Sequence, residues 1–262
     1  VEAGLRTHDK WQPFPEEVNR RVAGVIADLH FAPTEWARGN LLKEGVPAEQ
    51  VVVTGNPVID ALQVVARHET PKQIDRLLER LDVDSGKDMK SGKRLILVTA
   101  HRRENFGAPL EQICKALIGL AERGDVEIVY PVHPNPNVQE TTTRQLSNVP
   151  HVTLLPAQDY LSMIHLIKQA YLVLSDSGGI QEEAPHFGVP VLVLRNVTER
   201  PEGLEAGVLK LVGTSRQVIV NEASLLLDDP AAYARMAKAV HPFGDGHAAE
   251  KIVRALINNS PM

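Results

Sequence analysis

This sequence of 262 residues contains one cysteine, carries no net positive charge and has no long apolar run. The one cysteine, Cys114, excludes a disulfide within the chain and leaves a metal site only histidine and carboxylate ligands. No apolar run approaches the roughly 18 residues needed to span a bilayer, so we expect no membrane partner and a cytoplasmic location. The formal net charge of −5 gives no electrostatic reason for a nucleic-acid partner.

Short apolar segments alternate with helical segments throughout residues 94–195. Continuous apolar runs bounded by polar turns are typical of strands that are buried on both faces. The alternation therefore predicts an α/β protein with a doubly wound parallel sheet, which binds ligands at the carboxyl ends of its strands. The expected strands are 94–100, 126–132, 151–155, 171–177 and 189–195.

The stretch SDSGGIQEE (175–183) places two glycines before the expected start of a helix. Glycines let a ligand approach the backbone, and the N–H groups of residues 178–180 are donors at a helix start, which suit a phosphate. Ser177 adds a hydroxyl and is expected to cap the helix, while Glu182 is expected to be a surface residue that complements the helix dipole. Glu183 lies about 6 Å deeper by helix rise, a depth that suits the hydroxyls of a ribose. A capped helix with a tight turn and no ligand is the alternative.

Two further polar clusters follow expected strands. In HRREN (101–105), His101 can act as an acid, a base or a donor to phosphate near neutral pH, and Arg102 can help to clamp phosphate. In PVHPNPNV (131–138), two prolines bracket His133 in a rigid turn. A solvated loop and a purely structural turn are the alternatives, but the position of both clusters at the ligand edge of the sheet favours function.

Carboxylates and arginines supply the remaining candidates. Glu2 sits at an expected strand end, and Glu16 lies in the first turn of a helix expected at 16–27. Carboxylates that approach one cavity from different elements can have separated pKa values and divide acid from base work. Arg20, one turn after Glu16, can pair with it or position it, and Arg200 in NVTERPEG is a candidate phosphate contact. Each of these residues can instead be a surface charge, a cap or part of a surface salt bridge.

With these motifs the chain resembles the non-hydrolysing UDP-N-acetylglucosamine 2-epimerase family from residue 1 to about residue 257. The matching blocks, in order, are VEAGLRT, PFPEEVNR, TGNPVIDAL, HRRENFG, PVHPNPNV, SDSGGIQEEAP, TERPEG and PFGDG. The resemblance implies two Rossmann-like domains of the glycosyltransferase-B type, the N-terminal one incomplete in this chain. The expected divisions are 1–67 for the remainder of the N-terminal domain, 68–93 for a polar linker and flexible loop, 94–245 for the C-terminal UDP-binding domain and 246–262 for an amphipathic closing helix.

The resemblance also implies a reaction. Members of the family invert C2 of UDP-GlcNAc to give UDP-ManNAc, by elimination of UDP to a 2-acetamidoglucal intermediate and re-addition of UDP. This chemistry needs no nicotinamide, no metal and no other cofactor. We accordingly expect a UDP-sugar substrate, a regulatory UDP-GlcNAc, a homodimer and a place in the biosynthesis of cell-surface polysaccharide.

Matching positions carry the roles of the family's residues onto this chain. Glu2, Glu16 and His101 match the catalytic residues, and Arg102 and His133 are candidates for the regulatory nucleotide. Met163 stands where members of the family have Phe. The expected substrate-binding residues are Arg20, Gln158, Met163, Ser177, Gly178, Gly179, Glu183 and Arg200.

The family has a further segment before VEAGLRT, with basic residues and another catalytic aspartate. We therefore expect residues 1–262 by themselves to bind nucleotide without epimerising it. The alternatives are a 2-epimerase of a UDP-2,3-diacetamido uronic acid, a hydrolysing relative, a glycosyltransferase and a UDP-sugar-binding module without activity. The paired carboxylates Glu2 and Glu16 argue against a glycosyltransferase.

Overall fold

A computed structural model describes residues 1–83 and 92–259, which fall into two compact units. Unit 1 comprises Val1–Arg67, Val197–Ala206 and His241–Met262. Unit 2 comprises His68–Asn196 and Gly207–Val240. In the described part of the chain no helix has the length and apolar character needed to cross a bilayer.

Unit 2 is built on a six-stranded sheet in which all paired strands are parallel. Its strand order, β5-β4-β3-β6-β7-β8, is that of a Rossmann fold, and the order reverses between β3 and β6. The α/β class and the parallel sheet predicted from the alternating pattern are therefore confirmed. The strands are β3 (Arg94–Thr99), β4 (Val126–Pro131), β5 (Val152–Leu155), β6 (Leu172–Ser175), β7 (Val191–Val193) and β8 (Leu209–Leu211).

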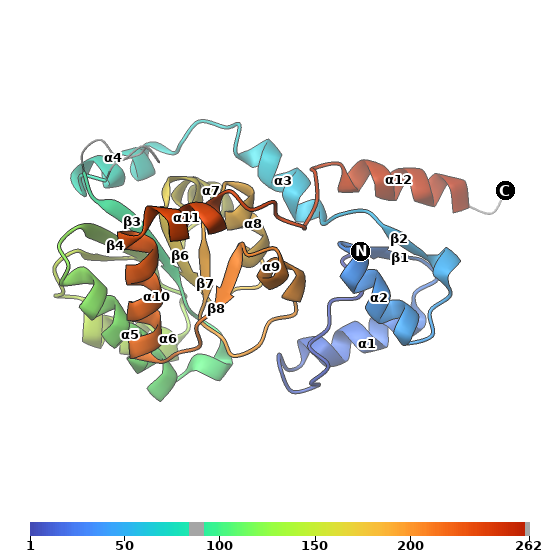
Figure 1. The fold of residues 1–262 in the computed structure, drawn as a ribbon, viewed down its shortest axis with the longest axis horizontal. Helices are drawn as coiled ribbons and strands as arrows, with labels where there is room; N and C mark the ends of the chain where they lie inside the picture. Colours follow the sequence, from blue (N-terminus) through green and yellow to red (C-terminus); the bar gives the residue numbers. More distant parts are fainter. Residues whose placement is uncertain (84–91, 260–262) are drawn as a thin grey trace. The chain divides into compact units, whose positions relative to one another are not determined.

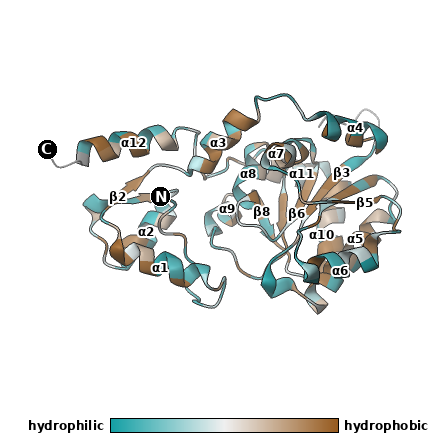
Figure 2. Ribbon diagram, turned by 180° about the vertical axis from the view of Figure 1, so that it is seen from behind, coloured by the Kyte–Doolittle hydropathy of each residue, from teal (hydrophilic) through white to brown (hydrophobic). Residues whose placement is uncertain are grey.

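Helices cover both faces of this sheet, which explains why its central strands are apolar on both sides. On one face lie α5 (Ala108–Ala121), α6 (Pro136–Leu146) and α10 (Arg216–Asp228), and on the other lie α7 (Tyr160–Gln169) and α8 (Ile180–His186) (Figure 1). The strands are correspondingly hydrophobic along their length (Figure 2). Cys114 of α5 is buried as a free thiol, and this burial raises its pKa to about 12. Unit 2 also contains α4 (Lys72–Arg80), η2 (Arg103–Asn105) and α11 (Pro230–Ala237).

Unit 1 contains a smaller sheet in which β1 and β2 pair in parallel, with His30 opposite Val51. Its core is formed by small and branched apolar residues, including Ala37 and Leu41. Gly45 follows the helix α2 (Glu35–Lys43) with a φ of +91°, the left-handed conformation that commonly ends a helix. The elements are α1 (Glu16–Ile26), β1 (His30–Ala32), α2 (Glu35–Lys43), η1 (Ala48–Gln50), β2 (Val51–Val53), α3 (Pro57–Val65), α9 (Pro201–Glu205) and α12 (Ala248–Asn259).

Residues 241–245, which were expected to belong to the C-terminal domain, fall within unit 1. The amide of Asn56 donates to the carbonyl of Phe243, and a Cβ on Gly55 would lie 3.1 Å from the Cα of Gly244. The carboxylate of Asp60 then accepts from the first amides of α12. The PFGDG motif therefore joins the closing helix to unit 1 through backbone contacts that only small residues permit.

Other local expectations differ from the structure. The stretch 68–93, expected to be a linker and a flexible loop, contains the helix α4, whose Ile74 and Leu77 are buried. The expected loop falls largely on residues 84–91, which lie outside the described residues. Helix α1 forms as predicted, but Val25 on its apolar side is 87% exposed. Glu2 does not follow a strand, although the amide of Ala3 donates to Phe31 of β1.

Candidate functional site

The reversal of strand order in unit 2 brings the ends of β3 and β6 together. Thr99 and Ser175 are register partners, and their hydroxyl oxygens lie 2.6 Å apart. Two residues further along the chain, after β3 and after β6, lie His101 and Ser177, which are two of the predicted site residues. Open α/β sheets bind ligands at this point because the connections from the two strands leave toward opposite faces and expose a crevice.

Asp176 organises this crevice. The carboxylate is fully buried, and it accepts hydrogen bonds from the amides of His101 (2.9 Å) and Arg102 (2.8 Å) and from the side-chain amide of Asn105 (2.9 Å). Asn105 donates as well to the carbonyl of Leu194 after β7 (3.1 Å). One buried charge thus fixes the loop after β3 to the ends of β6 and β7. The sequence motifs did not single out Asp176, although it directly precedes Ser177.

His101 and His133 lie face to face, with ring centroids 5.2 Å apart. Burial lowers the pKa of His101, while the Asp176 carboxylate, 3.7 Å from Nδ1, partly opposes this effect and the nearby His133 and Arg102 add to it. The imidazole is therefore held mainly neutral at pH 7, which suits a group that exchanges a proton. The loop fixed by Asp176 thus brings together three predicted residues, His101, Arg102 and His133.

The turn at residues 177–179 presents backbone donors. The amide of Ser177 donates to Ser175 Oγ (3.0 Å), whereas the amides of Gly178 and Gly179 donate to no group within the described ranges of the chain. A Cβ added to Gly179 would meet no atom within 4 Å, so the turn faces open space. The expectation that Ser177 caps the helix is wrong: the N-cap of α8 is Gly179, because the turn separates Ser177 from the helix start.

Glu183 lies in the first turn of α8 and is only 6% exposed. Its Oε1 accepts a hydrogen bond from the hydroxyl of Tyr160 (3.0 Å), and burial beside this carboxylate raises the pKa of Tyr160 above its ordinary value. Glu182 is 1% exposed, so the expectation of a surface residue is wrong. The reason is that α8 packs against β6, β7 and α7 and presents little of its surface to solvent.

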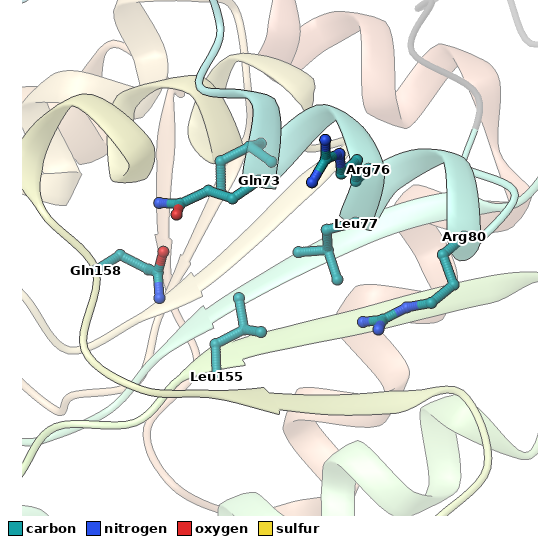
Figure 3. A pocket seen from close by; sticks show the side chains of 7 residues that line it. Gln73, Arg76, Leu77, Arg80, Leu155 and Gln158 are labelled. Carbon is teal, nitrogen blue, oxygen red and sulfur yellow. The ribbon is translucent and has the colours of Figure 1, made fainter.

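Gln158 and Met163, the predicted uridine-binding residues, lie before and within α7. The Gln158 side chain donates to the carbonyl of Pro156 (2.7 Å), and Met163 is half-buried. Gln158 also lines a pocket of about 250 Å³ between α4 and β5, to which α4 contributes Arg76, Leu77 and Arg80 and β5 contributes Leu155 (Figure 3). The pocket is completed by Gln73 and Ile74. The α4 side of this pocket was not predicted, because its residues fall in the stretch expected to be a linker.

In unit 1 the backbone around Glu2 is held in an uncommon conformation. Glu2 has a φ of +56°, which is left-handed for a residue that carries a side chain. Gly4 has a φ of +87°, and a Cβ there would lie 2.1 Å from the carbonyl oxygen of Ala37. Asn40 donates to the Gly4 carbonyl (2.9 Å) and secures this approach to α2. Strain of this kind persists at sites where the surrounding structure imposes it, and functional residues are a common case.

The two carboxylates that open α1 have different environments. Glu17 is fully buried and accepts from the amides of Thr7 and His8, both at 3.2 Å. Glu16, the predicted catalytic residue, is half-buried, and the preceding segment contains cis peptide bonds before Pro13 and Pro15. The hydrogen bonds of Glu17 to the backbone of residues 7 and 8 give this carboxylate a structural role.

A network of charged side chains links Glu2, Arg20 and Arg200. Glu2 Oε1 lies 3.2 Å from Asn56 Nδ2 and 3.5 Å from Arg200 Nη2. Arg200 and Arg20 both contact the buried carboxylate of Glu199, which the sequence placed only in a polar loop. Unit 1 therefore assembles three predicted residues around an unpredicted one.

Two further buried polar pairs flank these sites. Glu202 accepts from the Thr34 hydroxyl (2.7 Å), and burial raises the pKa of Glu202. Arg195, at the end of β7, is fully buried and pairs with Glu104 (2.8 Å), so it is part of the scaffold. Among the residues that the structure describes, no group of three or more His, Cys, Asp or Glu side chains could hold a metal ion.

Unit 2 is a doubly wound α/β protein of the Rossmann-like class, with a polar crevice at its switch point. The chain belongs to the UDP-N-acetylglucosamine 2-epimerase family, whose model matches residues 1–257. It is 51% identical over 257 residues to a probable UDP-N-acetylglucosamine 2-epimerase of Ralstonia solanacearum, covering 98% of this chain and 68% of that protein. It is 48% identical over 265 residues to the UDP-N-acetylglucosamine 2-epimerase of Escherichia coli (strain K12), covering 99% of this chain and 68% of that protein.

Solved structures of this family share the fold. The UDP-GlcNAc 2-epimerase of Neisseria meningitidis, bound to UDP-GlcNAc, superposes with a TM-score of 0.91 at 43% identity and covers 99% of this chain and 69% of its own. The MnaA protein of S. aureus, in a structure with UDP, gives a TM-score of 0.90 at 46% identity and covers 100% of this chain and 70% of its own. These neighbours have the glycosyltransferase-B type of fold that the sequence motifs predicted.

Proposed function

We propose that this protein interconverts UDP-GlcNAc and UDP-ManNAc by inverting C2 of the sugar. The observation that supports this proposal best is the placement of His101 and the Ser177–Gly179 turn side by side at the switch point of unit 2. The family to which the chain belongs acts on UDP-GlcNAc by the names of its members, and two solved relatives hold UDP-GlcNAc or UDP.

Unit 2 binds the nucleotide in this proposal. The diphosphate is held by Ser177, Gly178 and Gly179. Successive backbone N–H groups in a turn form a concave site that binds anions. Glu183 accepts the ribose hydroxyls, and its hydrogen bond from Tyr160 fixes the carboxylate for that role. The uridine contacts Gln158 and Met163. Met is polarizable and tolerates a flat ring, so it can replace an aromatic residue under a base.

Unit 1 supplies the acid–base chemistry, together with His101. A carboxylate removes the proton from C2, the C1–O bond breaks, and its electron pair leaves with UDP to give the 2-acetamidoglucal intermediate. UDP then adds back to C1 while a protonated group delivers a proton to the opposite face of C2. Glu2 and Glu16 are the proposed acid and base, and Arg20 and Arg200 stabilise the charge of the departing diphosphate.

The proposed reaction leaves the oxidation state of the sugar unchanged, so it needs no redox cofactor. Proton transfer at C2 and loss of a diphosphate are within the reach of carboxylate, imidazole and guanidinium groups. The same reasoning applies to a 2,3-diacetamido uronic acid substrate. The choice between the two sugars therefore rests on the family's named substrate.

Incubation of the whole protein with UDP-GlcNAc in D₂O tests the proposal. Turnover through a C2 proton transfer exchanges solvent deuterium into C2, which proton NMR detects as the loss of the H2 signal, with UDP-ManNAc formed beside it. Release of free ManNAc and UDP would identify a hydrolase instead. UDP-GlcNAc that retains its H2 in the presence of the whole protein would rule out the proposed activity.

Three further points belong to the proposal. Arg102 and His133, which lie beside His101, contact a second, regulatory UDP-GlcNAc. The protein acts in the cytoplasm as a homodimer, which sedimentation of the whole protein would test. A polypeptide of residues 1–262 binds UDP without turnover, because the relatives are about half as long again; measured epimerisation by this polypeptide would contradict that expectation.

A further inference from the structure

One buried carboxylate in unit 1 forms ion pairs with two arginines that are far apart in sequence. Glu199 is 1% exposed, and its Oε1 lies 3.3 Å from Arg20 Nη2 and 3.1 Å from Arg200 Nη1. Arg20 comes from α1, whereas Arg200 is the N-cap of α9, 180 residues further along the chain. Glu199 is therefore the point at which these two guanidiniums are tied together.

The charges around Glu199 alternate in sign. Arg200 extends from Glu199 to Glu2, with Nη2 3.5 Å from Glu2 Oε1. Arg20 extends from Glu199 to Glu17, with Nη1 3.9 Å from Glu17 Oε2. Each guanidinium thus lies between two carboxylates, and the two cations are separated by an anion that weakens their mutual repulsion.

The burial of Glu199 gives this arrangement its physical consequence. A carboxylate removed from water is costly unless cations and hydrogen bonds compensate it, so the side chain holds its partners firmly in place. A guanidinium on a long, flexible side chain otherwise loses conformational entropy when it binds an anion. Arginines that are already fixed avoid this loss, and fixed donors are what stabilise a charge that develops during a reaction.

Glu199 itself is poorly placed to touch a ligand. Its side chain is almost fully enclosed, and the oxygen that contacts Arg20 is the same oxygen that contacts Arg200. The Arg20 side chain is 24% exposed, whereas Arg200 is buried, with its side chain 4% exposed, and it links Glu199 to Glu2. An effect of Glu199 on the reaction must therefore pass through the arginines.

We propose that Glu199 is the positioning residue for Arg20 and Arg200, and that it sets the orientation in which both guanidiniums meet the anionic part of the substrate. The inference rests on the proposed function, in which these arginines bind the diphosphate. It assigns to Glu199 control over affinity for UDP and the UDP-sugar. Proton transfer at C2 remains the task of other groups.

The test compares E199Q, E199D and the control E205Q in the whole protein. Glu205 lies at the end of α9, the short helix that begins just after Arg200, and is exposed. Calorimetry gives the affinity for UDP, steady-state kinetics give KM and kcat for UDP-GlcNAc, and circular dichroism checks that each variant is folded. E199Q keeps the shape and removes the charge, so UDP affinity should fall on the order of 10-fold, KM should rise similarly, and kcat should fall as well because the same guanidiniums stabilise the charge of the departing diphosphate. E205Q should behave as the wild type.

Rescue by the conservative variant separates positioning from a merely structural role. E199D keeps the charge on a shorter side chain, and it should recover part of the lost affinity. A folded E199Q with wild-type UDP affinity and KM would overturn the proposal, even where the wild type epimerises UDP-GlcNAc. If E199Q does not fold, E199D carries the test: a several-fold loss of UDP affinity supports positioning, and wild-type affinity overturns it. If the wild type binds UDP but does not epimerise UDP-GlcNAc, only the proposed function is contradicted. The role of Glu199 is then still tested by comparing the UDP affinities of the wild type and the variants.

Discussion

The groups proposed to meet an anionic ligand are of different kinds in the two units. In unit 2 they are backbone amides at the turn of residues 177–179, which directly follows β6 and the buried carboxylate of Asp176. In unit 1 they are long cationic side chains, held by other charged side chains. Backbone donors are positioned by the fold itself, whereas guanidiniums have to be positioned by additional ion pairs. Precise placement of such flexible groups therefore requires buried charge, and buried charge is costly.

The largest effect is expected in unit 1, from removal of the proposed acid and base. Glu2→Gln and Glu16→Gln should each lower kcat of the whole protein by about 10²- to 10⁴-fold, the usual contribution of a general acid or base. UDP affinity by calorimetry should change little, because neither carboxylate is proposed to hold the nucleotide. Glu35→Gln, an exposed carboxylate of α2, is the matched control. Equal activity in all three variants would remove unit 1 from the proton transfer.

The next effect concerns Asp176, the buried carboxylate that holds the loop after β3 in unit 2. Asp176→Asn should lower the free energy of unfolding by about 3 kcal/mol, since three donors lose a charged acceptor. Removal of the carboxylate should also lower the pKa of His101 further, because Asp176 now raises it against burial. Urea unfolding measures the stability and NMR titration the pKa. Glu122→Gln, at the exposed end of α5, should change neither.

The sign of the pH dependence follows from the lowered pKa of His101. The folded state resists protonation of this imidazole, so its contribution to stability is present above the unfolded pKa near 6.5 and is lost as pH falls below it. In Asp176→Asn this loss should extend to lower pH. A His101 pKa that stays constant or rises in the variant would contradict the proposed electrostatic link.

A smaller effect is expected at the ribose end of unit 2. Glu183→Ala should weaken UDP binding by roughly 1.5–3 kcal/mol, the value of a hydrogen bond to a charged group, which is roughly a 10- to 150-fold rise in Kd. Tyr160→Phe removes only the hydroxyl that donates to this carboxylate and should cost about 0.5–1.5 kcal/mol. Calorimetry with UDP measures both. Unchanged affinity in Glu183→Ala would restore the alternative of a capped helix without a ligand.

The smallest effect is expected from Glu202→Gln, which measures how much the burial of one carboxylate in unit 1 lowers the stability of the protein. Burial raises the pKa of Glu202 in the folded state above its unfolded value of about 4.3. The folded state therefore favours the neutral carboxyl group. The resulting contribution to stability is complete below the unfolded pKa and is lost as the pH rises through the folded pKa. Glu202→Gln should therefore gain stability relative to the wild type between pH 4 and 7, by less than about 1 kcal/mol. Urea unfolding at several pH values measures the difference. A constant difference across this range would show that the carboxylate is not penalised by burial.

The strands of unit 2 could be predicted from sequence because burial on both faces leaves a continuous apolar run, as in residues 94–99. Helix α4 was missed, since a helix with charged residues on most of its surface resembles a polar linker. The partner of a buried charge was also beyond prediction. Asp176 lies 75 residues from His101, and nothing in either motif states that the ends of β3 and β6 are neighbours.

The two glutamates of SDSGGIQEE illustrate the same limit. Their spacing from the glycines placed Glu183 at a depth that suits a ribose, which follows from helix geometry alone. That Glu182 is buried depends on the packing of α8 against β6, β7 and α7, which no local pattern contains.

The sequence by itself determined the fold class, the family and the residue types at each strand end, because hydrophobic periodicity and ordered motifs are local properties. Tertiary structure alone decided which charges are buried, which carboxylate holds which arginine, and that residues 197–206 and 241–262 belong with unit 1. The physical reason is that an ion pair or a backbone contact depends on distance in space, and the chain brings Arg20 and Glu199 together only when it has folded.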